Sequence, residues 1–215
     1  MSGLVVFTIL VLSVGLFASL YFGRDTRARR KLARTPVQAI VDVTPGTTTR
    51  LTGKIQRLHE DLTAPMTGRR CAYYLVIVEE YRSHGKGGNW AEVLREEQHV
   101  DFLLRDNTGV ARIQMDAPHV VVVRDHKTRS GTFDDATAVE AAFLERFNKQ
   151  ATNFLGLNRT LRYSEGALES GEEITVLGAA RPGAGEVDLV VESPAEGPLL
   201  LTDHPGTVKA MPAAK

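Results

Sequence analysis

The chain of 215 residues has a single cysteine, Cys71. One cysteine excludes an intramolecular disulfide and the zinc sites that are built from paired cysteines. The six histidines form neither His-x-His nor His-Glu-x-x-His, so a zinc site would need distant residues to converge in the fold. We therefore predict no metal site and no cofactor.

Recognised catalytic motifs are also missing. The sequence has no Gly-x-Ser-x-Gly, no phosphate-binding P-loop, no dinucleotide fingerprint and no protein-kinase set. We therefore predict no catalytic residue, and an enzyme is the less favoured class. One enzymatic alternative stays open, namely a membrane-bound hydrolase whose site the fold assembles from residues such as His99, Asp101 and Glu165.

The chain has no net charge, since 26 basic residues balance 26 acidic ones, but the charges are unevenly distributed. Residues 24–34 hold six basic residues against the single acid Asp25, a charge of +5, so residues 35–215 carry −5. A domain that binds the phosphates of nucleic acid generally presents a basic surface. The acidic balance therefore argues against nucleic acid as a partner and against an oligonucleotide-binding barrel.

Residues 3–22, GLVVFTILVLSVGLFASLYF, contain no charged side chain. Twenty residues in a helix, at about 1.5 Å each, span roughly 30 Å, which is the hydrocarbon thickness of a bilayer. We predict a transmembrane helix over residues 1–23. A cleaved signal peptide is the rival interpretation, but no Lys or Arg precedes the apolar run and no small-x-small cleavage site follows it.

A basic cluster follows within a predicted juxtamembrane neck and linker over residues 24–47. Its members are Arg24, Arg27, Arg29, Arg30, Lys31 and Arg34. By the positive-inside rule, these charges place the N-terminus outside and the C-terminal domain in the cytoplasm. Anionic lipid beside the span accounts for the cluster better than a nucleic-acid-binding arm does, so the bilayer is the first predicted partner.

Period-two hydrophobic patterns bounded by Gly, Pro, Asn and Asp predict strands through most of the remaining chain. They cover residues 48–59, 71–81, 97–115, 119–124, 160–168, 172–180, 186–192 and 198–203. Within 97–115, the sequence Asp-Asn-Thr-Gly at 106–109 predicts the reversal of a hairpin. Gly53 inside the first strand indicates a bend or bulge.

A single soluble helix is predicted over residues 138–150, where Val139, Phe143 and Phe147 share a face and Thr137 with Glu140 forms a capping-box pattern. The predicted fold class is mainly β: a partly closed antiparallel β-barrel or sandwich with one short helix and one core. We expect this domain to cover residues 48–204 and a disordered tail to cover residues 205–215.

Cys71 begins the apolar run CAYYLVIVEEY. Strict alternation places Cys71 on one strand face with Tyr73 and on the opposite face from Tyr74. Both faces are apolar, so the strand should be central and the cysteine a packing residue. A redox or nucleophilic role is the alternative, since Arg69 and Arg70 are the only nearby groups that could favour a thiolate.

A set of short motifs resembles the "beside a membrane" domain of the GIDE-type membrane-anchored ubiquitin ligases and their shorter bacterial relatives. The motifs are Pro65, Thr67-Gly68, Cys71 and Tyr73-Tyr74, then Phe102, Asp106 and Gly109, then Arg162, Glu165, Leu168, Gly171 and Gly178. The resemblance covers roughly residues 48–203. It implies a module that lies against the membrane and serves binding or regulation.

The ligases of that family end in a RING, which needs about eight Cys and His ligands for two zinc ions. One cysteine cannot supply such a set, so the resemblance does not carry ligase activity to this chain. We expect a single-pass, membrane-anchored β-domain that acts as a protein-interaction or regulatory module, with a protein partner at the membrane.

Four residues are candidates for binding. Lys86 and Trp90 lie in the glycine-rich stretch SHGKGGNW, which predicts a flexible loop whose tryptophan contacts a partner or the bilayer, or folds back on the barrel. Arg162 and Glu165 form the second pair, either an internal ion pair or part of a ligand cleft. Residues 124–135 are interpreted as a solvated loop.

Overall fold

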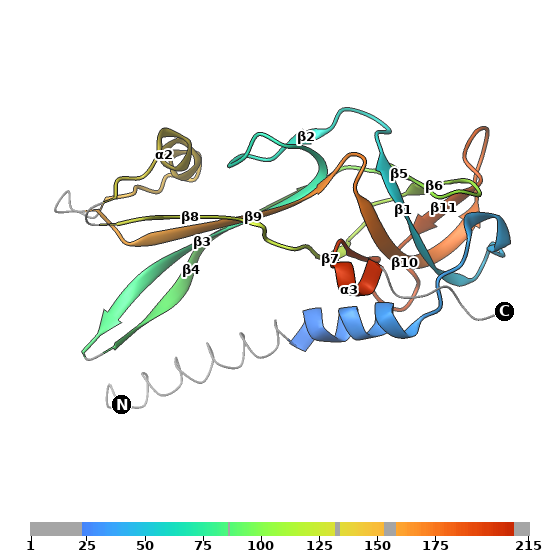
Figure 1. The fold of residues 1–215 in the computed structure, drawn as a ribbon, viewed down its shortest axis with the longest axis horizontal. Coiled ribbons are helices and arrows are strands. Elements are labelled where there is room, and N and C mark those ends of the chain that lie inside the picture. The colour runs from blue at the N-terminus through green and yellow to red at the C-terminus, as the bar shows by residue number, and fades with distance from the viewer. Residues whose placement is uncertain (1–22, 86, 132–133, 153–157, 209–215) are drawn as a thin grey trace.

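The computed structural model describes residues 23–85, 87–131, 134–152 and 158–208. The molecule is elongated, with a barrel at one end and an extended sheet at the other (Figure 1). A helix over residues 23–34 runs beneath the barrel, and the short 3-10 helix η1 (Ile40–Asp42) follows it.

The barrel is built from five strands in the order β1-β5-β6-β11-β10, and β10 pairs with β1 to close it. Two further strands, β12 and β7, continue from β10. The bounds are β1 (Thr48–Gln56), β5 (Phe102–Arg105), β6 (Val110–Ile113), β7 (His119–Val121), β10 (Glu173–Pro182), β11 (Leu189–Glu192) and β12 (Leu200–Thr202). The barrel is therefore closed where we predicted partial closure.

Two strand pairs, β11 with β6 and β12 with β7, are parallel, so the predicted wholly antiparallel arrangement is wrong in these places. The predicted hairpin is confirmed: β5 and β6 are antiparallel, and Asp106 accepts hydrogen bonds from the backbone N–H groups of Thr108 and Gly109 in the turn. No bulge occurs at Gly53, where β1 pairs regularly with β10. A glycine is needed there for another reason, because a Cβ atom would lie 2.5 Å from the carbonyl oxygen of Arg105 in β5.

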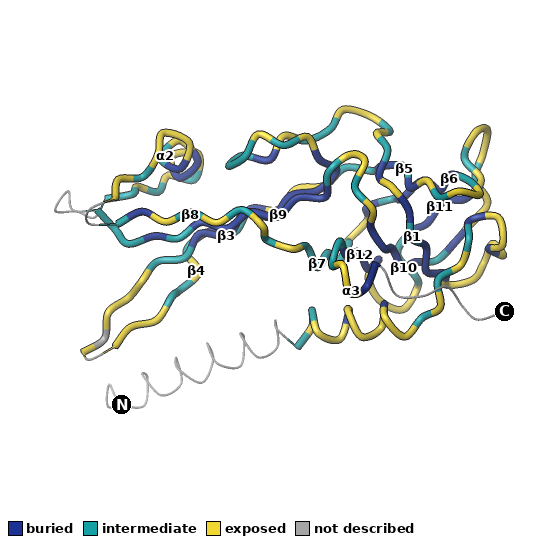
Figure 2. The backbone as a smooth tube through the Cα atoms, in the orientation of Figure 1, coloured by how far each residue is buried: buried dark blue, intermediate teal, exposed yellow. Residues whose placement is uncertain are grey.

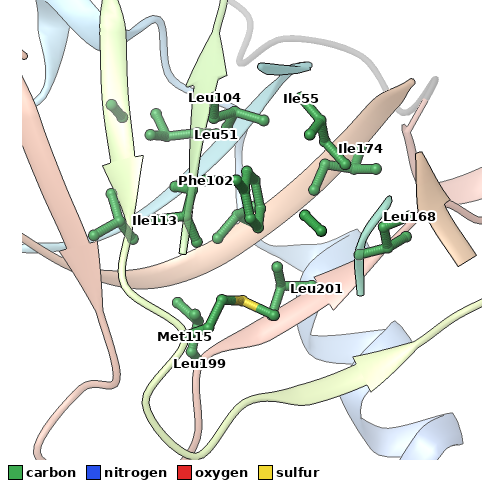
Figure 3. Close-up of a cluster of buried hydrophobic side chains, with 14 of the residues drawn as sticks. Leu51, Ile55, Phe102, Leu104, Ile113, Met115, Leu168, Ile174, Leu199 and Leu201 are labelled. Carbon is green, nitrogen blue, oxygen red and sulfur yellow. The ribbon is translucent and has the colours of Figure 1, made fainter. Parts of the chain in front are cut away.

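Apolar side chains fill the barrel. Phe102, Leu104 and Ile113 from the β5–β6 hairpin meet Leu51 and Ile174 from β1 and β10, and all five are at most 1% exposed (Figure 3). At roughly 25 cal/mol per Å² of apolar surface removed from water, such a cluster provides most of the driving force for closing the barrel.

The second sheet runs β4-β3-β9-β8, with the short strand β2 pairing at the start of β3. Its bounds are β2 (Leu62–Thr63), β3 (Arg70–His84), β4 (Gly87–His99), β8 (His126–Ser130) and β9 (Leu161–Glu169). The stretches 83–90 and 124–135 were predicted as loops, and both predictions are wrong in part, since β3, β4 and β8 run through them. Residues 87–89 of β4 are exposed, and half-buried and exposed residues alternate over residues 126–129 of β8 (Figure 2).

Helix α2 (Ala138–Glu145) covers the other face of this sheet through Phe143 and Leu144. The predicted capping box is confirmed, because the Thr137 side chain accepts from the Glu140 N–H and the Glu140 side chain accepts from the Thr137 N–H. The helix ends five residues earlier than predicted, and Val139 is 48% exposed rather than part of the buried face. A second cluster of buried side chains lies here, so the molecule has more than the one core we expected.

The predicted neck is not only a linker. Within helix 23–34, Ala28 and Leu32 are buried against Leu177 and Leu200 of the barrel, which fixes this helix to the domain. The predicted span over residues 1–23 lies, apart from Gly23, outside the described residues. Among the residues that the structure describes, no helix is both long and apolar enough to cross a bilayer.

The first four residues of the predicted disordered tail, 205–208, are ordered. Pro205–Val208 form the short helix α3, in which Thr207 and Val208 are buried. The guanidinium of Arg50 in β1 donates to the backbone carbonyl of Thr207 at 2.5 Å, which ties α3 to the barrel. The rest of the predicted tail lies outside the described residues.

Candidate functional site

Arg162 and Glu165 do not meet. They are three residues apart in β9, an odd number, so their side chains point to opposite faces of the sheet. Arg162 forms a two-bond pair with Glu79 of β3, at 2.6 and 2.7 Å, and this bond raises the pKa of Arg162. The internal ion pair that we considered for Arg162 and Glu165 is therefore wrong.

Arg162 takes part in a second contact, with Trp90. Its guanidinium carbon lies 4.5 Å from the centroid of the Trp90 ring, and that of Arg129 lies 5.2 Å away. Tyr81, paired with Trp90 across β3 and β4, packs edge-on at 5.5 Å. We call Tyr81, Trp90, Arg129 and Arg162 the aromatic–arginine surface. Trp90 lies in strand β4 and not in the flexible loop that we predicted, and its ring packs against these three neighbours.

Lys86, the fourth candidate, lies outside the described residues, between β3 and β4. The hairpin of these two strands extends away from the barrel, and its outer residues are exposed (Figures 1 and 2). Arg129, which completes the aromatic–arginine surface, was missed because it lies in β8, which the sequence pattern did not distinguish from a loop.

Glu165 is fully buried at the junction of the two sheets. Its carboxylate accepts from the backbone N–H of Met66 at 2.7 Å and from the Thr67 hydroxyl at 2.5 Å, and Arg69 lies 3.6 Å away. Arg69 also binds Asp125 through two hydrogen bonds. These contacts make Glu165 a group that fixes the turn before β3.

Arg69 was not singled out from the sequence as a site residue. It pairs with Asp125 at 2.8 Å and with Glu169 at 2.9 Å, besides its approach to Glu165. The bond to Asp125 raises the pKa of Arg69 and lowers that of Asp125. A run of basic residues before an apolar strand gives no sign of three acidic partners that lie so far along the chain.

Cys71 lies on the opposite face from the one that alternation predicted. The pairing of β3 with β9 shifts register between Cys71 and Tyr73, and this irregularity puts Cys71 in the cluster of Tyr74 while Tyr73 faces the barrel core. The thiol is fully buried, and burial, followed by the charge of Glu165, raises its pKa to about 11. A buried thiol of this kind is a packing group.

The basic cluster of helix 23–34 is exposed and mostly on one side. Arg24, Arg27, Arg30, Lys31 and Arg34, here called the basic stripe, are all exposed. At 3.6 residues per turn, Arg27, Arg30 and Arg34 are turned away from the buried residues Ala28 and Leu32, whereas Arg24 and Lys31 lie beside the buried face. Arg29 differs, since it donates to the Nε2 atom of His204 at 2.9 Å. The stripe is therefore held on a surface that the barrel orients.

A family model supports the resemblance seen in the sequence. The model of GIDE, described as E3 Ubiquitin ligase, matches residues 74–207, which is more than half of the chain. The chain belongs to the GIDE family. The GIDE match begins in β3 and ends in α3, so it contains Arg162 and Glu165 as well as Trp90.

Two other comparisons add nothing to this assignment, since no curated protein and no solved structure matches the chain. Whether these residues could form a RING depends on how many zinc ligands they contain. These 215 residues hold one cysteine and six histidines, which is fewer than the roughly eight ligands that a two-zinc RING requires.

Proposed function

We propose that this GIDE-family chain is a single-pass membrane protein whose β-rich domain lies at the cytoplasmic face of the bilayer and acts as a protein-interaction or regulatory module, without ubiquitin ligase activity. The observation that carries the proposal is the basic stripe. Five exposed cationic residues follow directly after the predicted span, on a helix that is packed onto the barrel.

A docked helix has a consequence for how the module works. A flexible neck would let the domain turn freely relative to the predicted span, whereas packing of Leu32 against the barrel fixes helix 23–34 relative to the domain. The aromatic–arginine surface then has a fixed position relative to the lipid. Tryptophan, tyrosine and arginine are the residue types most enriched at energetically important positions of protein interfaces, which supports this surface as the partner site.

Protease protection tests the membrane placement. In intact cells, a protease added outside should leave residues 35–215 uncut, and opening the cells should expose them. A reporter fused to the C-terminus should likewise show that the C-terminus is cytoplasmic. Replacing Arg24, Arg27, Arg30, Lys31 and Arg34 by glutamine should lower the fraction in this orientation, because the positive-inside bias is removed. Cleavage of residues 35–215 in intact cells would overturn the placement.

Partner capture tests the interaction surface. Trp90→Ala, alone and with Lys86→Ala, should reduce the amount of a given membrane protein that is crosslinked to the tagged chain by several-fold. Val139→Ala on α2 is the control, since Val139 is an apolar side chain on a different face and is exposed, whereas Trp90 is half-buried. Unchanged crosslinking, with normal thermal unfolding of the variant, would remove this surface from the proposal.

The hydrolase alternative finds no support in the site geometry. Asp101 is held by Arg112 at 2.7 Å and by the N–H of Met115 at 2.9 Å, and Glu165 is buried. Two surface hollows, of about 400 and 280 Å³, are lined by other residues. Among the described residues, no three His, Cys, Asp or Glu side chains are placed to hold a metal ion together.

A further inference from the structure

A hollow of about 400 Å³ lies between helix 23–34 and the short helix α3. It is lined by Thr26, Arg29, Arg30, Ala33, Gly206 and Thr207, and we call it the helix hollow. Its lining has two guanidinium groups and two hydroxyl groups but no carboxylate. Such a lining suits an anion, because every polar side chain in it can donate a hydrogen bond.

The two arginines of the hollow are not neutralised. Arg29 donates to a histidine ring, and in the described part of the chain Arg30 has no acidic partner within ion-pair distance. The closest acid in the sequence, Asp25, is instead bound to His119 at 3.0 Å. Arginine offers a planar pair of donors that matches phosphate or carboxylate oxygens.

A third guanidinium, that of Arg50, adds positive charge next to Thr207 of the hollow. Arg50 is 1% exposed and donates to the carbonyl oxygens of Thr35 and Thr207, at 2.9 and 2.5 Å, while its Nε atom has no hydrogen-bond partner. Thr207 is itself a wall of the hollow. Among the described residues no carboxylate acts on the pKa of Arg50, and burial lowers that pKa. A buried cation without a counter-ion is costly, and an anion nearby would reduce this cost.

We propose that the helix hollow binds the phosphate group of an anionic phospholipid. This inference rests on the proposed membrane placement, because helix 23–34 directly follows the predicted span and so places the hollow at the level of the lipid headgroups. Arg29 and Arg30 bind the phosphate oxygens, and the hydroxyl groups of Thr26 and Thr207 complete the lining. The bound lipid joins the basic helix to α3, and thereby to the barrel.

Lipid binding to the detergent-solubilised full chain tests the proposal. The probes are dioctanoyl phosphatidylglycerol, dioctanoyl phosphatidylcholine and inorganic phosphate, each titrated and read by native mass spectrometry. Phosphatidylglycerol should bind with one lipid per chain and more tightly than phosphatidylcholine. Inorganic phosphate should compete only weakly. Equal binding of free phosphate would make the hollow a site for a soluble phosphate and overturn the lipid assignment.

Two variants distinguish the hollow from general attraction to a basic helix. Arg30→Gln should weaken phosphatidylglycerol binding by about tenfold, the effect of one lost charge-assisted hydrogen bond. Arg34→Gln is the matched control, since it removes the same charge from the same helix outside the hollow, and its effect should be a few-fold at most. Ala33→Leu, which fills the hollow without changing charge, should also weaken binding.

Equal losses in the Arg30 and Arg34 variants, together with no loss in Ala33→Leu, would mean that the stripe attracts lipid without a defined site. That result overturns the inference and leaves the membrane placement standing. A failure of the membrane placement can also be told apart from a failure of the lipid site. Lipid binding in detergent does not depend on topology, whereas protease cleavage of residues 35–215 in intact cells tests the placement alone.

Discussion

At the scale of single residues, Cys71 shows how one irregularity changes a side chain's environment. The shift in pairing between Cys71 and Tyr73 reverses the face on which the cysteine lies, although both faces of the strand are apolar. Its surroundings consequently include the buried carboxylate of Glu165, which adds to the effect of burial on the thiol pKa.

We expect Cys71 to be unreactive in the folded chain. With a pKa of about 11, its thiol is almost entirely protonated at pH 8, and the sulfur is inaccessible. Iodoacetamide should therefore modify the native protein at pH 8 far more slowly than the same protein in denaturant, as followed by intact mass. Equal rates in both states would contradict the assignment of Cys71 as a packing residue.

Glu165 and Glu79 are two carboxylates bound to arginine-containing networks, but they differ in burial. Glu165 is fully buried and accepts from a backbone N–H, whereas the Glu79–Arg162 pair is partly exposed. Removing a buried acceptor leaves its donors without partners, while an exposed pair is already weakened by solvent.

Glu165→Ala should lower the free energy of unfolding by about 2–4 kcal/mol. Glu79→Ala, its control, should cost less than about 1 kcal/mol, because an exposed ion pair contributes little. Chemical denaturation of the full chain in detergent gives both values. Similar costs for the two variants would show that Glu165 does not hold the turn before β3.

At the scale of the elements, helix 23–34 combines two functions on two sides. Ala28 and Leu32 bind the helix to β10 and β12, and the five residues of the basic stripe remain exposed around the rest of the helix. The sequence predicted the charges but not the packing, because two small or apolar residues within a basic run are too few to define a hydrophobic face.

Leu32→Ala should detach this helix from the barrel, since loss of a fully buried leucine costs about 2–5 kcal/mol. Hydrogen exchange over residues 23–34 should then become faster, while exchange in the barrel strands should change little. Lys31→Ala, an exposed neighbour, serves as the control. Unchanged exchange in Leu32→Ala would mean that the helix is held by other contacts.

At the scale of the whole molecule, the junction between the two sheets gathers acidic groups. Glu172 follows β9 in the turn that leads to β10, and Asp203 and Asp125 come from other segments. Burial raises the pKa of Glu172 to about 7 from its ordinary value of 4.5, with further increases from Asp203 and Glu169. Its carboxylate form is therefore disfavoured in the folded state.

This shift predicts a dependence of stability on pH. Because the folded-state pKa of Glu172 is higher than the unfolded value, the folded state binds more protons between about pH 4.5 and pH 7, so stability falls as pH rises through that window. Glu172→Gln keeps an acceptor for the Glu169 N–H and should remove this fall. The melting temperatures of the original chain and of Glu172→Gln, measured from pH 5 to pH 8, should be similar at low pH. At high pH the variant should have the higher melting temperature. Parallel curves would contradict the prediction.

The sequence alone determined the features that depend on local patterns. Alternating apolar residues identified most barrel strands, Asp106 to Gly109 identified the hairpin, and Thr137 with Glu140 identified the helix cap. The short motifs around Arg162 and Glu165 were enough for the family resemblance. These signals are readable because each depends on residues that lie within a few positions of one another.

Only the tertiary structure decided which residues act together. Strands β4 and β8 are rich in polar residues because most of their residues are exposed or half-buried, so their composition resembled that of loops. The partners of Arg69, the contact of Trp90 with Arg129 and Arg162, and the hollow between helix 23–34 and α3 all join segments far apart in the chain. Strand pairing brings the first two sets of residues together, and packing of two helices onto the barrel forms the hollow. Neither leaves a pattern in the local sequence.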